Sequence, residues 1–219
     1  MGPAGGESVA VRMDRMYRHQ RHLYDATRKF YLLGRDRLVR DLDLQPGERA
    51  CEVGCGTGRN LIALARTYPA TELYGLDASQ AMLATASRKA AAAGLADRIR
   101  LRHGAAETLD RSLFGLDRPF DVIFFSYSLS MIPGRYAALD QAFAALAPRG
   151  RLAVVDFGDF GGLPGPCRAG LRWWLARFGV NPDPAMPDEI AGLARRRNAI
   201  AEILRPFRSY AVYVTVRRR

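Results

Sequence analysis

The sequence predicts an α/β fold built around one mostly parallel β-sheet. Strand-like and helix-like segments alternate from about residue 49 onward, a pattern typical of doubly wound sheets. A glycine-rich loop, CEVGCGTG, joins the first strand of this series to the first helix. The chain has 219 residues and is 48% apolar, which is enough for one compact domain of this class.

The N-terminal part precedes this alternation. Residues 1–12 are small and polar, and we expect them to be disordered. Apolar and aromatic side chains then recur at helical spacing up to Tyr31, and a break at Gly34 is followed by a short helix. We therefore predict N-terminal helices over residues 13–43 and a larger domain over residues 44–219.

The larger domain contains five strand-like segments with helices between them. The predicted strands are RACEVGCG, which ends in glycines, TELYGLDAS, RIRLRHGAAE, PFDVIFFSYSL and RLAVVDFG. The predicted helices are RNLIALARTYP, QAMLATASRKAAAAG and RYAALDQAFAALAPRG. The alternation fails over about residues 158–187, where we expect an irregular insert rich in Gly and Pro. A helix, DEIAGLARR, and two strands, within AIAEILRPF and SYAVYVTVRR, then complete the chain.

The composition and charge of the chain indicate what kind of partner and which compartment to expect. The net charge is +11 with a pI near 10.2, and nearly all the cations are arginines, which favours a polyanionic partner or an acidic substrate. Codon usage in a GC-rich genome is the alternative explanation. No apolar run reaches the ~18–20 residues of a spanning helix, and the N-terminus has no signal pattern. Three cysteines form no disulfide framework, and Cys51 and Cys55 lie in the glycine loop, so we predict no metal site.

The glycine loop and two carboxylates predict the ligand. Gly54, Gly56 and Gly58 follow Glu52 in a G-x-G-x-G pattern that lacks the features of a dinucleotide fingerprint or a P-loop. Asp77 ends the second strand, where a carboxylate can accept two hydrogen bonds from a ribose diol. Glu52 is placed to pair with an ammonium group. A ligand with a ribose, an ammonium and no pyrophosphate is S-adenosylmethionine (AdoMet); a purely structural glycine turn is the alternative.

Five segments resemble, in order, the motifs of class I AdoMet-dependent methyltransferases: EVGCGTG, GLDASQAML, HGAAE, FDVIFFSYSL and LAPRGRLAVVDF. The resemblance implies a Rossmann-like, seven-stranded sheet with a C-terminal antiparallel hairpin and N-terminal lid helices. It implies AdoMet as cofactor and S-adenosylhomocysteine as product. The implied cofactor contacts are Tyr24, Glu52, Gly54, Cys55, Gly56, Gly58, Asp77, Ala78, Met82, Ala106, Glu107 and Ser126. Ala105 stands where many relatives have an aspartate, so Glu107 is the expected substitute at the adenine amino group.

The substrate is predicted from the N-terminal segment. The chain has no [DN]-P-P-[YF] motif after the fourth strand, which argues against methylation of a base or amide nitrogen. The segment MDRMYRHQRHLYDATRKFYLLGRDRLVRDL resembles the start of betaine-lipid N-methyltransferases of the BtaB type. These enzymes methylate the amine of diacylglycerylhomoserine three times. The resemblance therefore implies a lipid substrate with an amine and a carboxylate.

The residue types of this segment suit that headgroup. Aromatic rings can hold a methylated ammonium by cation–π attraction, and arginines can bind a carboxylate with two hydrogen bonds. A hydrogen-bond acceptor must also lie near the amine, and His19 is one candidate. The expected catalytic residues are Tyr24, Tyr31, Tyr127 and His22. The expected substrate-binding residues are Tyr17, Arg28 and Arg35.

The basic segments predict a location. Residues 11–40 carry nine cationic side chains against three aspartates, and the insert places Trp173 and Trp174 among arginines. We expect a cytoplasmic protein bound to the inner, anionic face of the membrane, with the enzyme that makes diacylglycerylhomoserine as a partner and no nucleic acid. Two alternatives stay open: a methyltransferase of another small molecule (a quinone, a polyketide or another amine), and an RNA-binding protein.

Overall fold

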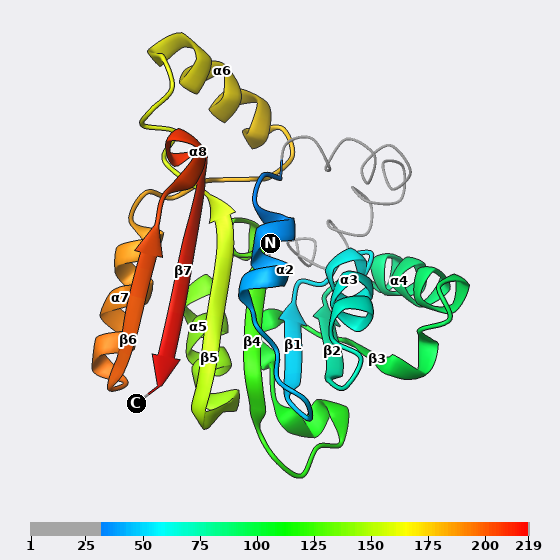
Figure 1. Cartoon of the computed structure of the whole chain (residues 1–219). Coiled ribbons are helices and arrows are strands. Elements are labelled where there is room, and N and C mark those ends of the chain that lie inside the picture. The colour runs from blue at the N-terminus through cyan, green and yellow to red at the C-terminus, as the bar shows by residue number, and fades with distance from the viewer. Residues whose placement is uncertain (1–31, 219) are drawn as a thin grey trace, which may run out of the picture.

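The computed structural model describes residues 32–218, so the predictions for residues 1–31 lie outside the described part (Figure 1). The strands are β1 (Arg49–Val53), β2 (Glu72–Asp77), β3 (Ile99–His103), β4 (Phe120–Ser126), β5 (Leu146–Phe157), β6 (Ala199–Leu204) and β7 (Ala211–Arg218). The α-helices are α2 (Arg35–Asp41), α3 (Arg59–Thr67), α4 (Gln80–Ala92), α5 (Arg135–Ala145), α6 (Gly165–Ala176), α7 (Met186–Arg196) and α8 (Pro206–Ser209). Four 3-10 helices are η1 (Ala96–Arg98), η2 (Ala106–Thr108), η3 (Arg111–Phe114) and η4 (Leu129–Met131).

The strands form one sheet in the order β3-β2-β1-β4-β5-β7-β6. Strand β1 pairs in parallel with β2 on one side and with β4 on the other, and β7 runs antiparallel to both β5 and β6. The predicted α/β fold with a C-terminal antiparallel hairpin is therefore confirmed. The strand order reverses beside β1, and an open sheet of this kind forms a crevice at the carboxyl ends of its central strands.

Helices cover both faces of the sheet (Figure 1). Helices α2 and α3 lie on one face, and α5 and α7 lie on the other. Strands β1 and β4 are buried on both faces, which explains why β4 is a nearly continuous apolar run, FDVIFFS. Beneath the loops at one end, the rings of Tyr74, Phe114 and Phe120 contact edge to face with centroids 5.3–5.8 Å apart. These packed layers fix where each parallel strand ends.

Helix α2 packs against the sheet through a glycine. Gly34 precedes the helix with a φ of +89°, and a Cβ added there would lie 1.8 Å from the hydroxyl oxygen of Tyr213. That hydroxyl donates a hydrogen bond to the Gly34 carbonyl. Leu38 and Val39 are buried in the core on this face. The break predicted at Gly34 is thus a close approach between α2 and β7, which only glycine permits.

Two segments differ from the sequence-based expectations. LAPRG, expected to end a helix, starts β5: Leu146 pairs with Phe120, and the register shifts before Arg151 pairs with Val122. The expected irregular insert contains the twelve-residue helix α6. Its glycines and prolines suggested a loop, but Pro166 lies in the first turn, where proline is tolerated. Apolar side chains then recur at helical spacing from Leu171 onward.

An arginine on β5 joins the N-terminal elements to the sheet. The guanidinium of Arg151 donates two hydrogen bonds to the Glu48 carboxylate, at 2.6 and 2.8 Å, and two more to the Leu42 carbonyl, at 2.7 and 3.2 Å. The Arg151 and Glu48 side chains are only 19% and 18% exposed. Such a paired contact leaves polar groups unsatisfied when one partner is removed.

We predict that Arg151→Met lowers the free energy of unfolding by about 1–3 kcal/mol, because Glu48 and the Leu42 carbonyl lose their donor. Urea denaturation measures this change. Arg149→Met, at an exposed position of the same strand, is the control and should stay within about 0.5 kcal/mol of the wild type. Equal stability of the two variants would show that the Arg151 contacts do not hold these elements together.

Candidate active site

A pocket opens at the carboxyl ends of β1, β2 and β4, where the strand order reverses. It lies between the glycine loop after β1, the start of α4 and the loop after β4. The residues that line it are Val53, Gly54, Gly56, Leu76, Asp77, Ala78, Met82, Gly104, Ala106, Ser126, Tyr127, Ser128, Met131 and Ile132. Its walls are thus mostly small or apolar, with a few polar groups at fixed positions, as is usual for ligand pockets.

The glycine loop needs its glycines for backbone reasons. Gly54, Gly56 and Gly58 have φ values of +74°, +54° and +73°, which side chains with a Cβ rarely adopt. A Cβ at Gly54 would lie 2.5 Å from the Cβ of Ser128, whereas a Cβ at Gly56 would meet no atom within 4 Å. The loop is therefore closed on the β4 side and open at Gly56, where a ligand can approach the backbone.

The carboxylate of Asp77 joins the two sides of the pocket. Its Oδ2 accepts a hydrogen bond from the Gly56 amide at 2.7 Å, and its Oδ1 accepts one from the Ser79 amide at 2.8 Å. The Ser79 hydroxyl in turn caps α4 by accepting from the Met82 amide at 3.3 Å. Asp77 thus fixes the glycine loop and the start of α4 relative to each other.

Glu52 is a buried acid behind the loop, 2% exposed. Its Oε1 accepts a hydrogen bond from the Asn60 side-chain amide at 2.6 Å, while Oε2 has no hydrogen-bond partner among the described residues. Burial raises the pKa of this carboxyl to about 8, although the Asn60 hydrogen bond opposes the shift. Asn60 also accepts from the Arg35 guanidinium at 3.4 Å, which connects α2 to Glu52.

The loop after β4 forms the opposite wall. Tyr127 has a φ of +54°, and its hydroxyl donates to the Leu33 carbonyl at 2.5 Å. The Ser128 hydroxyl donates to the Val53 carbonyl at 2.8 Å. Asp156, fully buried at the end of β5, accepts from the Ser130 amide at 2.9 Å. Burial raises the pKa of the Tyr127 phenol and of the Asp156 carboxyl.

The structure brings most of the described candidates together. The predicted residues that line the pocket are Gly54, Gly56, Asp77, Ala78, Met82, Ala106, Ser126 and Tyr127. Glu52, Cys55 and Gly58 do not line it, because the first two are buried beneath the loop and Gly58 faces Ala86 on α4. Glu107, the expected substitute at the adenine, points toward Gly134.

Other candidates lie elsewhere. Arg35 lines a second pocket, formed by residues 32–37 with Arg40, Arg59 and Phe207. Six predicted site residues lie outside the described part of the chain, so their roles stay predictions: Tyr17, His19, His22, Tyr24, Arg28 and Tyr31. Within residues 32–218, no group of three or more His, Cys, Asp or Glu side chains could hold a metal ion.

Sequence reasoning missed several lining residues: Val53, Leu76, Gly104, Ser128, Met131 and Ile132. These residues flank the predicted motifs and are mostly apolar or small. Their residue types alone therefore did not distinguish pocket-lining positions from core positions. Ser128 carried a usable signal, because it follows the end of a parallel strand two residues after Ser126. Met131 ends η4, a short helix that shows no sequence period, and Ile132 directly follows it.

Comparisons with known proteins identify the domain. A family model described as a methyltransferase domain matches residues 50–150. The ubiquinone/menaquinone biosynthesis C-methyltransferase UbiE of Cereibacter sphaeroides is 28% identical over 175 residues, covering 80% of this chain and 66% of that protein. The 27-O-demethylrifamycin SV methyltransferase of Amycolatopsis mediterranei is 35% identical over 122 residues, covering 56% of this chain and 43% of that protein. Residues 50–150 therefore carry a class I AdoMet-dependent methyltransferase domain.

A solved structure agrees with this methyltransferase domain in fold. The mitomycin 7-O-methyltransferase MmcR superposes with a TM-score of 0.74, over 97% of this chain and 61% of that one, at 18% identity. The cofactor of the methyltransferase domain is AdoMet, as predicted. The chain spans 66% of the UbiE relative and less than half of the rifamycin relative, so these likenesses do not define its substrate.

The residues present fit AdoMet. The open backbone at Gly56 gives a ligand access to the loop, and Asp77 places a carboxylate at the pocket wall. The Oε2 of Glu52 is a buried acceptor that no described donor satisfies. An ammonium group would supply the missing donor and favour the charged form of Glu52.

We predict that Glu52 makes the AdoMet-free protein less stable as the pH rises from about 4.5 to about 8. An acid whose pKa is higher in the folded state binds more protons there than in the unfolded chain. Its favourable contribution to the free energy of unfolding is therefore complete below about pH 4.5 and is lost by about pH 8. The wild type should lose up to about 1.4 kcal/mol per pH unit relative to Glu52→Gln. Urea denaturation at several pH values measures both proteins; parallel pH profiles would contradict the prediction.

Proposed function

We propose that this protein is an AdoMet-dependent N-methyltransferase that methylates the amine of diacylglycerylhomoserine three times. The product would be the betaine lipid diacylglyceryl-N,N,N-trimethylhomoserine. The observation that carries the proposal is an arginine-rich pocket beside the cofactor pocket, suited to the carboxylate of this headgroup. The resemblance of the N-terminal segment to betaine-lipid N-methyltransferases supports the same substrate.

The arginine-rich pocket lies between α2, α3 and α8. It is lined by Leu32, Leu33, Gly34, Arg35, Asp36, Arg37, Arg40, Arg59 and Phe207. The lining contains four arginines and one carboxylate, that of Asp36, which pairs with Arg59 at 2.8 Å. Arg37 pairs with Asp41, outside the lining, at 2.9 Å. This excess of positive charge favours an anionic group, and the guanidinium fork matches a carboxylate well.

Two contacts connect this pocket to the cofactor pocket. Leu33, at the edge of the arginine-rich pocket, accepts the hydrogen bond of Tyr127, which lines the cofactor pocket. Arg35 contacts Asn60, which holds Glu52 beneath the glycine loop. A headgroup whose carboxylate lies near Arg35 would therefore have its amine directed toward the loop after β4. An amine and a carboxylate on one small headgroup suit two adjacent pockets.

The reaction requires an uncharged amine. Bound AdoMet supplies a methyl group on a sulfonium, and the nitrogen lone pair forms the new C–N bond as the S–C bond breaks to leave S-adenosylhomocysteine. The headgroup ammonium releases three protons in total over three transfers, and the final quaternary nitrogen carries one positive charge. The described wall of the cofactor pocket contributes hydroxyls at Ser126, Tyr127 and Ser128 and no histidine or lysine. Within residues 32–218, the contribution of this wall is thus mainly orientation.

A second candidate is methylation of a quinone carbon. The names of the relatives favour it, since UbiE of Cereibacter sphaeroides and the demethylmenaquinone methyltransferase of Geobacillus kaustophilus both act in that class. A quinone has no carboxylate, so it gives no role to the excess of arginines near α2. We therefore place the lipid amine first. The enzyme that makes diacylglycerylhomoserine is a proposed partner because it would supply this substrate.

We predict that the purified protein transfers methyl groups from AdoMet to the nitrogen of diacylglycerylhomoserine, giving mono-, di- and trimethylated lipid by mass spectrometry. Arg35→Gln should raise the KM for this lipid by about tenfold or more, because a charge-assisted hydrogen bond to its carboxylate is lost. The KM for the methyl ester of the same lipid should change little. Arg66→Gln, at an exposed position of α3, is the control.

Methylation of a demethylated quinone without any methylation of the lipid amine would overturn the proposal in favour of the second candidate. Because Arg35 also contacts Asn60, AdoMet affinity of the Arg35 variant must be measured in parallel. A loss of AdoMet affinity that accounts for the whole effect, with the ester and the free lipid equally affected, would remove the carboxylate role from Arg35.

A further inference from the structure

Helix α6 projects from the end of the molecule where the parallel strands finish (Figure 1). Leu175 is its only buried residue, and Leu171 and Trp174 pack partly against the core. The Trp174 ring lies against the Phe178 ring with centroids 4.9 Å apart. One side of α6 thus attaches the helix to the domain, and the rest of its surface is exposed.

The exposed side combines an aromatic ring with cations. Trp173 is 64% exposed, which is unusual for a side chain of this size. The Arg177 guanidinium lies 4.9 Å from the centre of its ring. Arg168 and Arg172 are exposed on the same helix. The two tryptophans of the sequence therefore have different environments: Trp174 packs inward and Trp173 faces outward.

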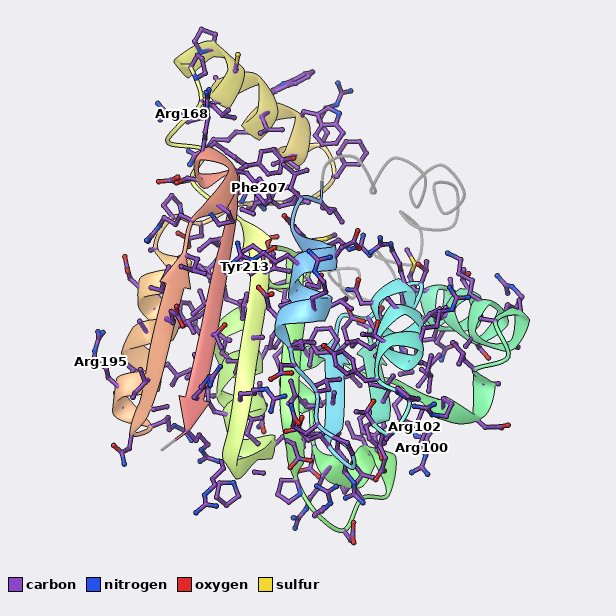
Figure 2. The ribbon with its side chains drawn as sticks, in the orientation of Figure 1. Arg100, Arg102, Arg168, Arg195, Phe207 and Tyr213 are labelled. Atoms are coloured by element: carbon purple, nitrogen blue, oxygen red, sulfur yellow. The ribbon has the colours of Figure 1, made fainter. Side chains whose placement is uncertain are left out.

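Helix α8, in the connection between β6 and β7, repeats this combination. Phe207 is 48% exposed, and Arg205 and Arg208 on either side of it are exposed too. Figure 2 shows Phe207 and Arg168 at the same end of the molecule. Backbone hydrogen bonds hold α8 to the segment that leads into α6: the Phe160 and Gly162 amides donate to the carbonyls of residues 209 and 208, at 3.0 and 3.2 Å.

The two helices form what we call the α6–α8 face, defined by Arg168, Arg172, Trp173, Arg177, Arg205, Phe207 and Arg208. Residues 158–180 contain three arginines and one aspartate, and residues 205–210 contain two arginines and no acid. Aromatic rings beside cations at one exposed end are typical of surfaces that lie in a lipid headgroup layer. Within residues 32–218, no helix has both the length and the apolar character needed to cross a bilayer.

We propose that the α6–α8 face binds an anionic lipid surface. Trp173 and Phe207 would enter the headgroup layer while the arginines pair with lipid phosphates. The face lies at the same end of the sheet as the cofactor pocket, so a lipid headgroup would reach the pocket without leaving the surface (Figure 1). Phe207 also lines the arginine-rich pocket, so the face adjoins that pocket. The proposed membrane binding does not depend on which substrate is methylated.

Sedimentation with vesicles tests the proposal. Binding of the full-length protein should be strong to vesicles of phosphatidylcholine with phosphatidylglycerol, weak to phosphatidylcholine alone, and should fall with added salt. The double variant Arg168→Gln/Arg172→Gln should bind anionic vesicles roughly 25-fold more weakly, at about a factor of five for each arginine. Arg195→Gln/Arg196→Gln is the matched control, since both are exposed arginines of α7 and Figure 2 shows Arg195 away from the face.

The aromatic part has its own control. Trp173→Ser should weaken vesicle binding about fivefold or more, whereas Ile200→Ser, at a 54% exposed apolar residue of β6, should not. Calorimetric AdoMet affinity should be unchanged in all these variants. Equal binding to neutral and anionic vesicles, or equal loss in the α7 control, would overturn the proposal. So would tight binding of a short RNA that depends on the same residues while vesicles are not bound.

Discussion

The carboxylate of Asp77 is the contact on which the rest of the site depends. It accepts hydrogen bonds from the Gly56 amide after β1 and from the Ser79 amide at the start of α4. The parallel pairing of β1 with β2 brings these two strand ends together, and Asp77 fixes the loops that leave them. The left-handed glycines can then keep the loop open at Gly56. A small number of backbone hydrogen bonds thus determines the shape of the cofactor pocket.

A second set of contacts ties the N-terminal part of the described chain to this pocket. The carbonyl of Leu33 accepts from Tyr127, the carbonyl of Gly34 accepts from Tyr213, and Arg35 contacts Asn60. Three consecutive residues therefore contact the loop after β4, strand β7 and helix α3 respectively. Because Asn60 also holds Glu52 beneath the glycine loop, these contacts connect α2 to that loop.

Much of this could be predicted from the sequence because the signals are local. The glycine pattern is readable because few residues other than glycine adopt the positive φ values of the loop. Asp77 is readable because it is a carboxylate at the end of a predicted parallel strand. Helix α6 and the β5 start at Leu146 could not be predicted, because their glycines and prolines are locally ambiguous and tertiary packing decides between helix, strand and loop. Tertiary packing also decides that Trp173 is exposed while Trp174 packs inward, and no sequence period reveals this. The same holds for Arg35, which lines a different pocket from the cofactor pocket.

The central claim is that Asp77 both organises the pocket and holds the cofactor ribose. The most direct measurement is calorimetric titration of AdoMet into Asp77→Ala, with a urea unfolding curve to confirm that the variant is folded. The account predicts an affinity about 10–100-fold weaker than that of the wild type, because charge-assisted hydrogen bonds to the ribose are lost and the glycine loop loses its acceptor. Unchanged AdoMet affinity in a cooperatively folded variant would contradict it.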